Sequence, residues 1–420
     1  MRTPSPTWSP LVGRAVFWSC AAALCGLGAA RSGVTPDVYG NDFTVFYAAA
    51  RQVILTGNPY DTAIRAATPY LYPPLFAQLL TPLALFPLPV AAGVWAVGNV
   101  VAVLWLWRLA QPALTPPHAN ATRATRAWLW WAALAPVFVG NILLGQVNLW
   151  IAVAVTFALS ADAERRRSPA AGFALALALS VKVSPVLLLP YFVGRRAWRL
   201  LGWCAFWVLL VNSLSLSLLG EHSRDIIQGW YREVIVQGWR FDFAVPSNQS
   251  LYGALLRVEL WLGIPGRLSY WPLAALGAVW LFSVGWVSRR AIEPAAYPAA
   301  ATAGAWCVLG AKLSWVVHFA LLALPVAVAL GGRARRWAAE AGVVGFALCA
   351  WSGFQVVPSA LRCTVEAWSL FAGAGMAIML ALALALRLDL CRAADEEASS
   401  APALFTACNK GQMGRPGRPR

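Results

Sequence analysis

The stretch from Gly40 to Pro74 reads GNDFTVFYAAARQVILTGNPYDTAIRAATPYLYPP and is the first long polar and aromatic segment between apolar runs. After the carboxylate of Asp42, apolar residues recur at helical spacing, which predicts an amphipathic helix in the plane of a membrane surface. Its predicted apolar face comprises Phe43, Phe46, Tyr47, Ala50, Val53 and Ile54. Arg51 and Gln52 fall on another face. Gly57-Asn58-Pro59 predicts the end of this helix, because proline cannot continue the hydrogen-bond ladder.

The composition around this stretch is that of a membrane protein. Of the 420 residues, 60% are hydrophobic and only 12% are charged, whereas soluble domains have about 25% charged residues. Many windows approach the ~20 apolar residues that a helix needs to cross a bilayer. We therefore predict an all-α, polytopic transmembrane helical bundle of about 11–12 spans, some of them broken or re-entrant, with extracytoplasmic interfacial helices.

The positive charges that give the chain its net charge of +16 are also distributed as in a membrane protein. Arginines cluster in short runs between apolar segments, namely Arg165–Arg167, Arg195–Arg199, Arg289–Arg290 and Arg333–Arg336. Such runs are typical of cytoplasmic loops, so we expect a lipid bilayer and no nucleic acid as partner. The sequence predicts one membrane domain over residues 1–390 and a disordered, basic cytoplasmic tail over 391–420. Contact of this tail with anionic lipid or nucleic acid is the alternative.

Several apolar segments are interrupted by polar or proline-containing breaks. Residues 75–109 are split at 86–89, residues 128–161 at Gly140-Asn141 and again at 145–148, and residues 170–194 at 182–185. Broken helices within a membrane line a cavity in most cases, because their backbone groups need protein or water as partners. These breaks therefore predict a substrate-binding cavity.

The long polar loops over 31–72 and 220–250 are predicted to be extracytoplasmic, and a second interfacial helix is expected over 251–263. If every split segment crosses the membrane, Arg165–Arg167 lie outside the cell. The positive-inside rule instead expects arginine-rich loops in the cytoplasm. At least one piece, such as 75–88 or 171–182, is therefore expected to be short or re-entrant.

Asp42 is the first candidate catalytic residue. An Asp before a helix is also a common N-cap, which is the structural alternative. Its setting of Tyr39, Phe43 and Tyr47 suits sugar stacking at a membrane surface. Partial desolvation would raise the basicity of the carboxylate, which could then accept a proton from a sugar hydroxyl.

Two lysines and one histidine are candidates for binding an anion. An ammonium at membrane depth costs roughly 2.5–3.5 kcal/mol, so Lys182 is expected to meet a cavity or an anion unless it snorkels to the surface. Lys312 begins an apolar span and has the same alternative. His318, beside Ser314 and Trp315, lies within an apolar run and is either a phosphate donor or a hydrogen-bonded core residue. Polar side chains at helix breaks are further candidates, with capping or helix packing as the alternative: Gln146, Asn148, Asn248 and Gln249.

These motifs, taken in order, resemble the glycosyltransferases of family 87, a GT-C group of polytopic membrane enzymes. The opening block runs Asp42…Tyr47…Gly57-Asn-Pro-Tyr60…Tyr72-Pro-Pro74. The later blocks are Gly145-Gln-Val-Asn148, Lys182-x-Ser-Pro185, Asn248-Gln-Ser-Leu251 and Ser314-Trp-Val-Val-His318. The resemblance covers about residues 40–330, and its opening block is the most specific part.

The resemblance implies a mannosyltransferase that takes mannose from polyprenyl-phosphate-mannose and transfers it, with inversion, to a lipid-linked or cell-envelope glycan. It implies Asp42 as the general base, Lys182, His318 and Lys312 near the phosphate, and the tyrosines Tyr47, Tyr60 and Tyr72 as positioning residues. It also implies a multi-pass protein of a bacterial plasma membrane with an extracytoplasmic site. Where the family often has W-x-H-H, this chain has Trp315-Val-Val-His318, so one histidine is absent.

Other functions remain open from the residues alone. A transporter or a lipid or glycolipid flippase would also have broken helices, and the same enzyme class with arabinose or glucose would have the same motifs. There is no P-loop, no G-x-G-x-x-G before a strand and no H-E-x-x-H. We therefore expect no nucleotide cofactor and no metal, and a membrane-resident donor for any transfer chemistry.

Overall fold

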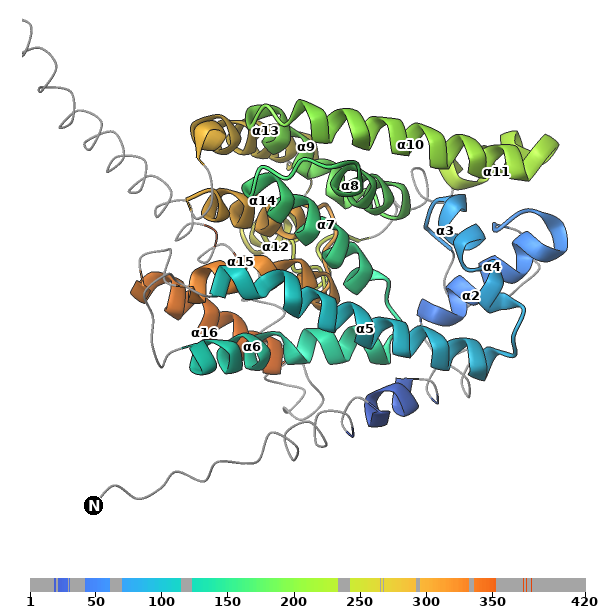
Figure 1. The fold of residues 1–420 in the computed structure, drawn as a ribbon, viewed down its shortest axis with the longest axis horizontal. Helices are drawn as coiled ribbons and strands as arrows, with labels where there is room; N and C mark the ends of the chain where they lie inside the picture. Colours follow the sequence, from blue (N-terminus) through green and yellow to red (C-terminus); the bar gives the residue numbers. More distant parts are fainter. Residues whose placement is uncertain are drawn as a thin grey trace, which may run out of the picture.

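The computed structural model describes residues 42–60, 70–114, 123–232, 242–264, 268–291, 295–331 and 336–352, with isolated positions near both ends of the chain. Within these residues the protein is an all-α membrane bundle, as predicted (Figure 1). Residues 365–386, apart from isolated positions, and the predicted tail at 391–420 lie outside the described residues, whereas residues 22–28 near the start of the chain are helical.

The Gly40–Pro74 stretch contains α2 (Asp42–Thr56), which ends directly before Gly57. Gly57 has a φ of +77°, so the predicted turn follows the helix. The buried face is rotated from the predicted one: Gln52 is 4% exposed and Ile54 is 41% exposed. The reason is that α2 packs against the short helices that follow it in the chain, and their position decides which of its residues are buried.

Two of those short helices, α3 (Pro74–Leu79) and α4 (Thr81–Ala84), come directly after the polar stretch. They have only six and four residues, so neither helix is long enough to cross a bilayer, and the segment 75–88 is short, as predicted. In Figure 1, α2, α3 and α4 lie together at one end of the bundle, beside the start of α5 (Leu88–Leu114).

The first half of the bundle continues with α6 (Arg123–Leu143) and α7 (Asn148–Ala163). α6 passes through Gly140-Asn141 without interruption, so the predicted break there is wrong and the chain turns only at 144–147. The predicted break at Lys182 is present, between α8 (Pro169–Val181) and the 3₁₀ segment η1 (Ser184–Leu188). The chain then continues through α9 (Leu189–Gly194), α10 (Trp198–Leu219), η2 (Gly220–His222) and α11 (Ser223–Trp230).

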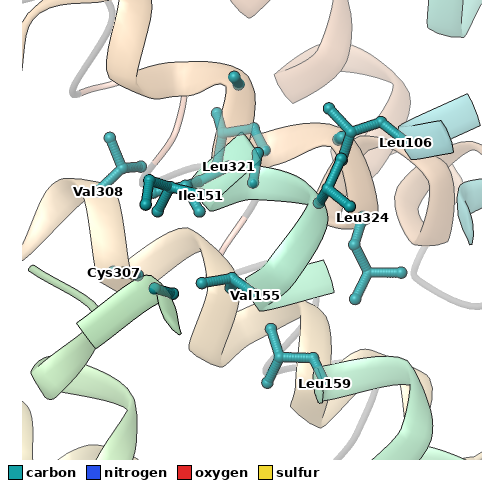
Figure 2. Packing of buried hydrophobic residues seen from close by; sticks show 14 of the residues in the cluster. Leu106, Ile151, Val155, Leu159, Cys307, Val308, Leu321 and Leu324 are labelled. Atoms are coloured by element: carbon teal, nitrogen blue, oxygen red, sulfur yellow. The ribbon is translucent and has the colours of Figure 1, made fainter. Parts of the chain in front are cut away.

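The second half contains the predicted helix α12 (Leu251–Trp261) and the apolar helix α13 (Tyr270–Val287), followed by η5 (Ser288–Arg290). The remaining elements are α14 (Tyr297–Leu309), η6 (Val316–Leu322), α15 (Ala323–Leu330) and α16 (Arg336–Ser352). The core lies where α5, α7, α14 and α15 meet. Figure 2 shows four of its residues, Leu106, Val155, Val308 and Leu324.

The helices differ in whether they are long enough to cross a membrane. In the described residues, four helices are long and apolar enough to cross a membrane, over Leu88–Leu114, Ala124–Leu143, Trp198–Trp230 and Tyr270–Arg290. The others are shorter; α7 has 16 residues and α8 has 13. At 1.5 Å per residue they span about 24 Å and about 20 Å, less than the ~30 Å hydrocarbon core.

The arginine-rich turns meet at the end of the bundle opposite α2, here called the arginine end. It comprises the turns 164–168, 195–197 and 288–291. Arg165 Nη2 donates to the carbonyl oxygen of Arg289 at 2.7 Å, and the buried carboxylate of Asp162 pairs with both Arg167 and Arg195 at 2.8 Å. Three of the arginine clusters, at 165–167, 195–199 and 289–290, therefore lie at one end of the described bundle, whereas residues 332–335 lie outside the described residues.

Candidate active site

The turn between α6 and α7 holds the start of α2. The backbone N–H of Asp42 donates to the carbonyl oxygen of Leu144 at 3.0 Å. Gly145 has a φ of +64°, and a Cβ at this position would lie 2.4 Å from the Cβ of Phe43. The indole N–H of Trp95 donates to the Gly145 carbonyl at 2.8 Å. Only glycine allows this close approach, so the turn fixes the position of Asp42.

Directly after this turn, three side chains from distant parts of the chain meet. Lys182 Nζ lies 2.6 Å from Asn148 Oδ1 and 2.9 Å from His318 Nε2. Asn148 Nδ2 donates in turn to Gln146 Oε1 at 3.0 Å. Asn148 begins α7, Lys182 ends α8, and His318 is in the first turn of η6. The ammonium of Lys182 is thus held inside the bundle and does not snorkel to the surface.

The hydrogen bond between Lys182 and His318 constrains the imidazole. An ammonium has donors only, so a charged Lys182 requires Nε2 to accept and places the ring proton on Nδ1. The alternative tautomer would have Nδ1 accept from the Trp315 N–H at 3.3 Å, which is longer than the usual range of about 2.7–3.2 Å. We therefore assign a neutral His318 beside a charged Lys182.

The carboxyl group of Asp42 is electrostatically linked to this cluster. Burial raises the pKa of Asp42 from 3.8 to about 6, and the nearby charge of Lys182 acts in the opposite direction. Burial also raises the pKa of the Tyr72 hydroxyl above its ordinary value, with a further contribution from the charge of Asp42. A carboxylate with this pKa is ionised at neutral pH and still basic enough to accept a proton in a reaction.

A narrow pocket opens beside the cluster. Its polar lining comprises Asn148, Lys182, Ser184, Cys307, Ser314 and His318. The remaining lining residues are apolar or small. In the described part of the chain, no three His, Cys, Asp or Glu side chains gather as a metal site would require.

Comparison with known proteins agrees with this arrangement. The model of glycosyltransferase family 87 matches residues 70–317, which is more than half of the 420-residue chain. The chain belongs to glycosyltransferase family 87. It is therefore an enzyme, a membrane glycosyltransferase, and the resemblance seen in the sequence is confirmed. The matched residues include Asn148 and Lys182; Asp42 precedes them and His318 follows them directly.

Two curated relatives support the same assignment. One, from Mycobacterium tuberculosis, is named polyprenol-phosphate-mannose-dependent alpha-(1-2)-phosphatidylinositol mannoside mannosyltransferase; it is 27% identical over 88% of this chain and 90% of its own length. The other, from Mycolicibacterium smegmatis, is named polyprenol-phosphate-mannose-dependent alpha-(1-2)-phosphatidylinositol pentamannoside mannosyltransferase; it is 25% identical over 52% of each chain. No solved structure matches this family 87 chain significantly.

The predicted tyrosines of this glycosyltransferase pack mainly against protein. Tyr47 donates its hydroxyl to the carbonyl of Phe86 at 2.9 Å, and Tyr60 donates to the carbonyl of Tyr72 at 2.6 Å. The ring of Tyr72 lies edge-on to Phe46, with centroids 5.0 Å apart. These hydrogen bonds and ring contacts hold the three partly buried side chains against protein, and their role in positioning the sugar stays a prediction.

Two other predicted residues, Asn248 and Gln249, hold the segment that leads to Trp315. Asn248 Nδ2 donates to the carbonyl of Lys312 at 3.2 Å, and its Oδ1 accepts from the Ser314 N–H at 3.0 Å. The Gln249 N–H donates to the Ser314 carbonyl at 2.6 Å. The Asn248 side chain and the Gln249 backbone therefore hold the loop between α14 and η6.

The same loop presents Lys312 and Trp315. Lys312 Nζ lies 4.2 Å from the ring centroid of Phe243, which is a cation–π contact. Desolvation lowers the pKa of this ammonium. Trp315 is 38% exposed, and its ring is stacked on His318 with an interplanar angle of 20°. Of the predicted aromatic residues, Trp315 offers the most evident sugar-stacking surface.

Sequence reasoning missed Asn141 and Trp95 as supporting residues. Asn141 is fully buried, and its Nδ2 donates to the carbonyls of Val137 at 2.7 Å and Val317 at 2.9 Å. It thereby joins α6 to the residue before His318. A polar residue within an apolar run was the available signal at Asn141, whereas Trp95 is one of 23 tryptophans and carries no local signal.

Proposed function

We propose that this family 87 enzyme transfers mannose from polyprenyl-phosphate-mannose to a hydroxyl of a mannose-bearing glycolipid, with inversion at the anomeric carbon. The observation that supports the proposal is the buried cluster of Lys182, Asn148 and His318, directly after the α6–α7 turn whose Leu144 carbonyl binds the backbone of Asp42. The donor and the acceptor class are taken from the names of the two relatives.

In this mechanism the acceptor oxygen attacks C1 of the sugar while the bond from C1 to the phosphate oxygen breaks. The bonding electrons leave with the polyprenyl phosphate, and the hydroxyl proton passes to the carboxylate of Asp42. Phosphate departs as an anion, so the leaving group needs positive charge and hydrogen-bond donors and no acid catalyst.

Lys182 meets the requirement of the leaving group. Two of its three N–H groups are directed to Asn148 and His318, which leaves the third for a phosphate oxygen. The two fixed partners hold the ammonium in place before the donor arrives, so little rearrangement is needed during the reaction. Trp315, which stacks on His318 and is 38% exposed, is available to stack on the sugar.

The depth of the cluster suits a lipid-linked donor. The arginine end marks one membrane surface, and α7 and α8 carry the chain about 20–24 Å from it to Asn148 and Lys182. The cluster then lies roughly 6–10 Å inside the opposite surface of a ~30 Å hydrocarbon core. A polyprenyl phosphate can reach this depth without leaving the bilayer. By the positive-inside rule the arginine end is cytoplasmic, so the reaction takes place on the extracytoplasmic side of the cell membrane.

A donor panel tests this function directly. The purified full-length protein is reconstituted in liposomes with a phosphatidylinositol mannoside acceptor and labelled polyprenyl-phosphate-mannose, -glucose or -arabinose. We expect transfer from the mannose donor alone, or at least about 100-fold faster than from the others. Preference for another sugar would refute the donor assignment. Movement of labelled lipid between leaflets without any new glycosidic bond would instead indicate a flippase.

A further inference from the structure

The arginine end has an exposed layer that the buried ion pairs do not explain. Arg165 and Arg196 have φ values of +60° and +53°, in the left-handed region that residues other than glycine adopt rarely. Arg167 Nη1 donates to the carbonyl of Arg196 at 3.2 Å, so the turns 164–168 and 195–197 are tied together. This backbone arrangement directs the Arg196 side chain to the exposed surface.

Arg196 and Arg289 share one aromatic ring there. Their guanidinium carbons lie 4.8 Å and 4.2 Å from the ring centroid of Trp286. Both distances are measured to one point, so the two carbons are at most about 9 Å apart. Two like charges at this separation repel each other unless an anion lies close by.

The nearby carboxylates are already engaged. Asp162 is buried between Arg167 and Arg195, and Glu164 pairs with Arg166. Across the described residues, no ion pair involves Arg196 or Arg289. Two guanidinium groups within about 9 Å of each other can both donate to the oxygens of one phosphate headgroup.

An apolar track leads away from these two arginines along α13. Phe282 stacks on Trp286 with ring centroids 6.1 Å apart. Leu276, Val279 and Phe282 are 70%, 66% and 40% exposed. They recur at three-residue spacing on the face of the helix that leads to Trp286. A charged headgroup site that continues into an exposed apolar track matches a phospholipid better than a soluble anion.

We propose that Arg196, Trp286 and Arg289 bind the phosphate headgroup of an anionic phospholipid in the leaflet that meets the arginine end, with an acyl chain along Phe282, Val279 and Leu276. The site lies at the opposite end of the bundle from Asp42 and is independent of the transfer reaction. The tryptophan lies at the level where aromatic side chains meet lipid headgroups.

Lipid binding to the full-length protein in detergent tests the proposal, with native mass spectrometry as the readout. We expect wild type to bind phosphatidylglycerol more tightly than phosphatidylcholine. The double variant Arg196→Gln/Arg289→Gln is expected to bind phosphatidylglycerol at least about tenfold more weakly. The matched control Arg199→Gln/Arg290→Gln removes the same charge from exposed arginines at the same end and is expected to lose less than about threefold.

Three outcomes would overturn the proposal. An equal loss of phosphatidylglycerol affinity in both double variants would mean that the lipid responds only to the total positive charge at this end of the protein. Equal affinity of wild type for the two lipids would mean that no headgroup site is present. If millimolar inorganic phosphate displaced bound lipid as strongly as phosphatidylglycerol does, the arginines would bind a soluble anion and the residues along α13 would not contribute to binding. Melting temperatures of all variants within about 2 °C of wild type show that folding is intact.

Discussion

Substituting Gly145 by Ala tests how the α6–α7 turn positions Asp42. The new Cβ would lie 2.4 Å from Phe43 Cβ, whereas ordinary contacts begin at 3.4 Å. The start of α2 must therefore move by about 1 Å, and a misplacement of this size costs on the order of 100-fold in rate. The φ of +64° adds a backbone cost of about 1–2 kcal/mol for a residue with a Cβ.

The assay is mannose transfer by the reconstituted enzyme, with kcat and donor KM measured separately. We expect kcat to fall about 100-fold while the donor KM changes little, because the Lys182 cluster keeps its contacts. The matched control is Gly98→Ala, where the new Cβ has its nearest neighbour at 3.6 Å, the Trp150 side chain, and no positive φ. Gly98→Ala is expected to retain activity. Full activity in Gly145→Ala would refute the idea that this turn sets the position of the base.

Three further predictions concern protonation, positioning and stability. The transfer rate should rise with pH through about 6 as Asp42 loses its proton. Lys182→Gln should shift the midpoint of this pH profile upward, because it removes a charge that lowers the pKa of Asp42, and it should raise the donor KM. An unchanged midpoint would contradict the electrostatic link between Lys182 and Asp42. Asn141→Leu removes two side-chain hydrogen bonds, of which the one to the Val317 carbonyl joins α6 to η6, and should cost about 1 kcal/mol of stability. The measurement is thermal unfolding, and an unchanged melting temperature would contradict the role of Asn141 in joining these elements. Arg195→Leu should destabilise the protein by about 3–5 kcal/mol, because the buried carboxylate of Asp162 loses one of its two arginine partners. The control Arg166→Leu changes an exposed arginine and should cost no more than about 1 kcal/mol. Similar losses of stability in both variants would contradict this prediction.

Local patterns predicted the helices but not the contacts between them. α2 and its end at Gly57 follow from spacing and turn chemistry, and the break at Lys182 follows from a cation in an apolar run. The buried face of α2 was predicted incorrectly because burial depends on where α3 and α4 pack, and that information lies outside the helix.

The site required contacts over long sequence separations. Lys182 and His318 are 136 residues apart, and Lys182 and Asn148 are 34 apart. The sequence marked each of them as a polar residue in an apolar setting, yet no spacing rule brings them together. The tyrosines are a similar case. The hydroxyl contacts of Tyr47 with Phe86 and of Tyr60 with Tyr72 have no signal in the sequence, and the predicted positioning of the sugar by these residues stays a prediction.

The most direct test of the catalytic claim is Asp42→Asn, with Asp42→Glu as its conservative control. Burial raises the pKa of Asp42, so its ionised form destabilises the folded state, and this cost appears as pH rises through about 6. The neutral amide should therefore leave the melting temperature at pH 8 equal to or above that of wild type. With donor affinity unchanged, we predict that transfer of mannose by Asp42→Asn falls by a factor of about 10²–10⁴, the usual contribution of a general base. Wild-type transfer rates in a folded Asp42→Asn enzyme would contradict the assignment of Asp42 as the base.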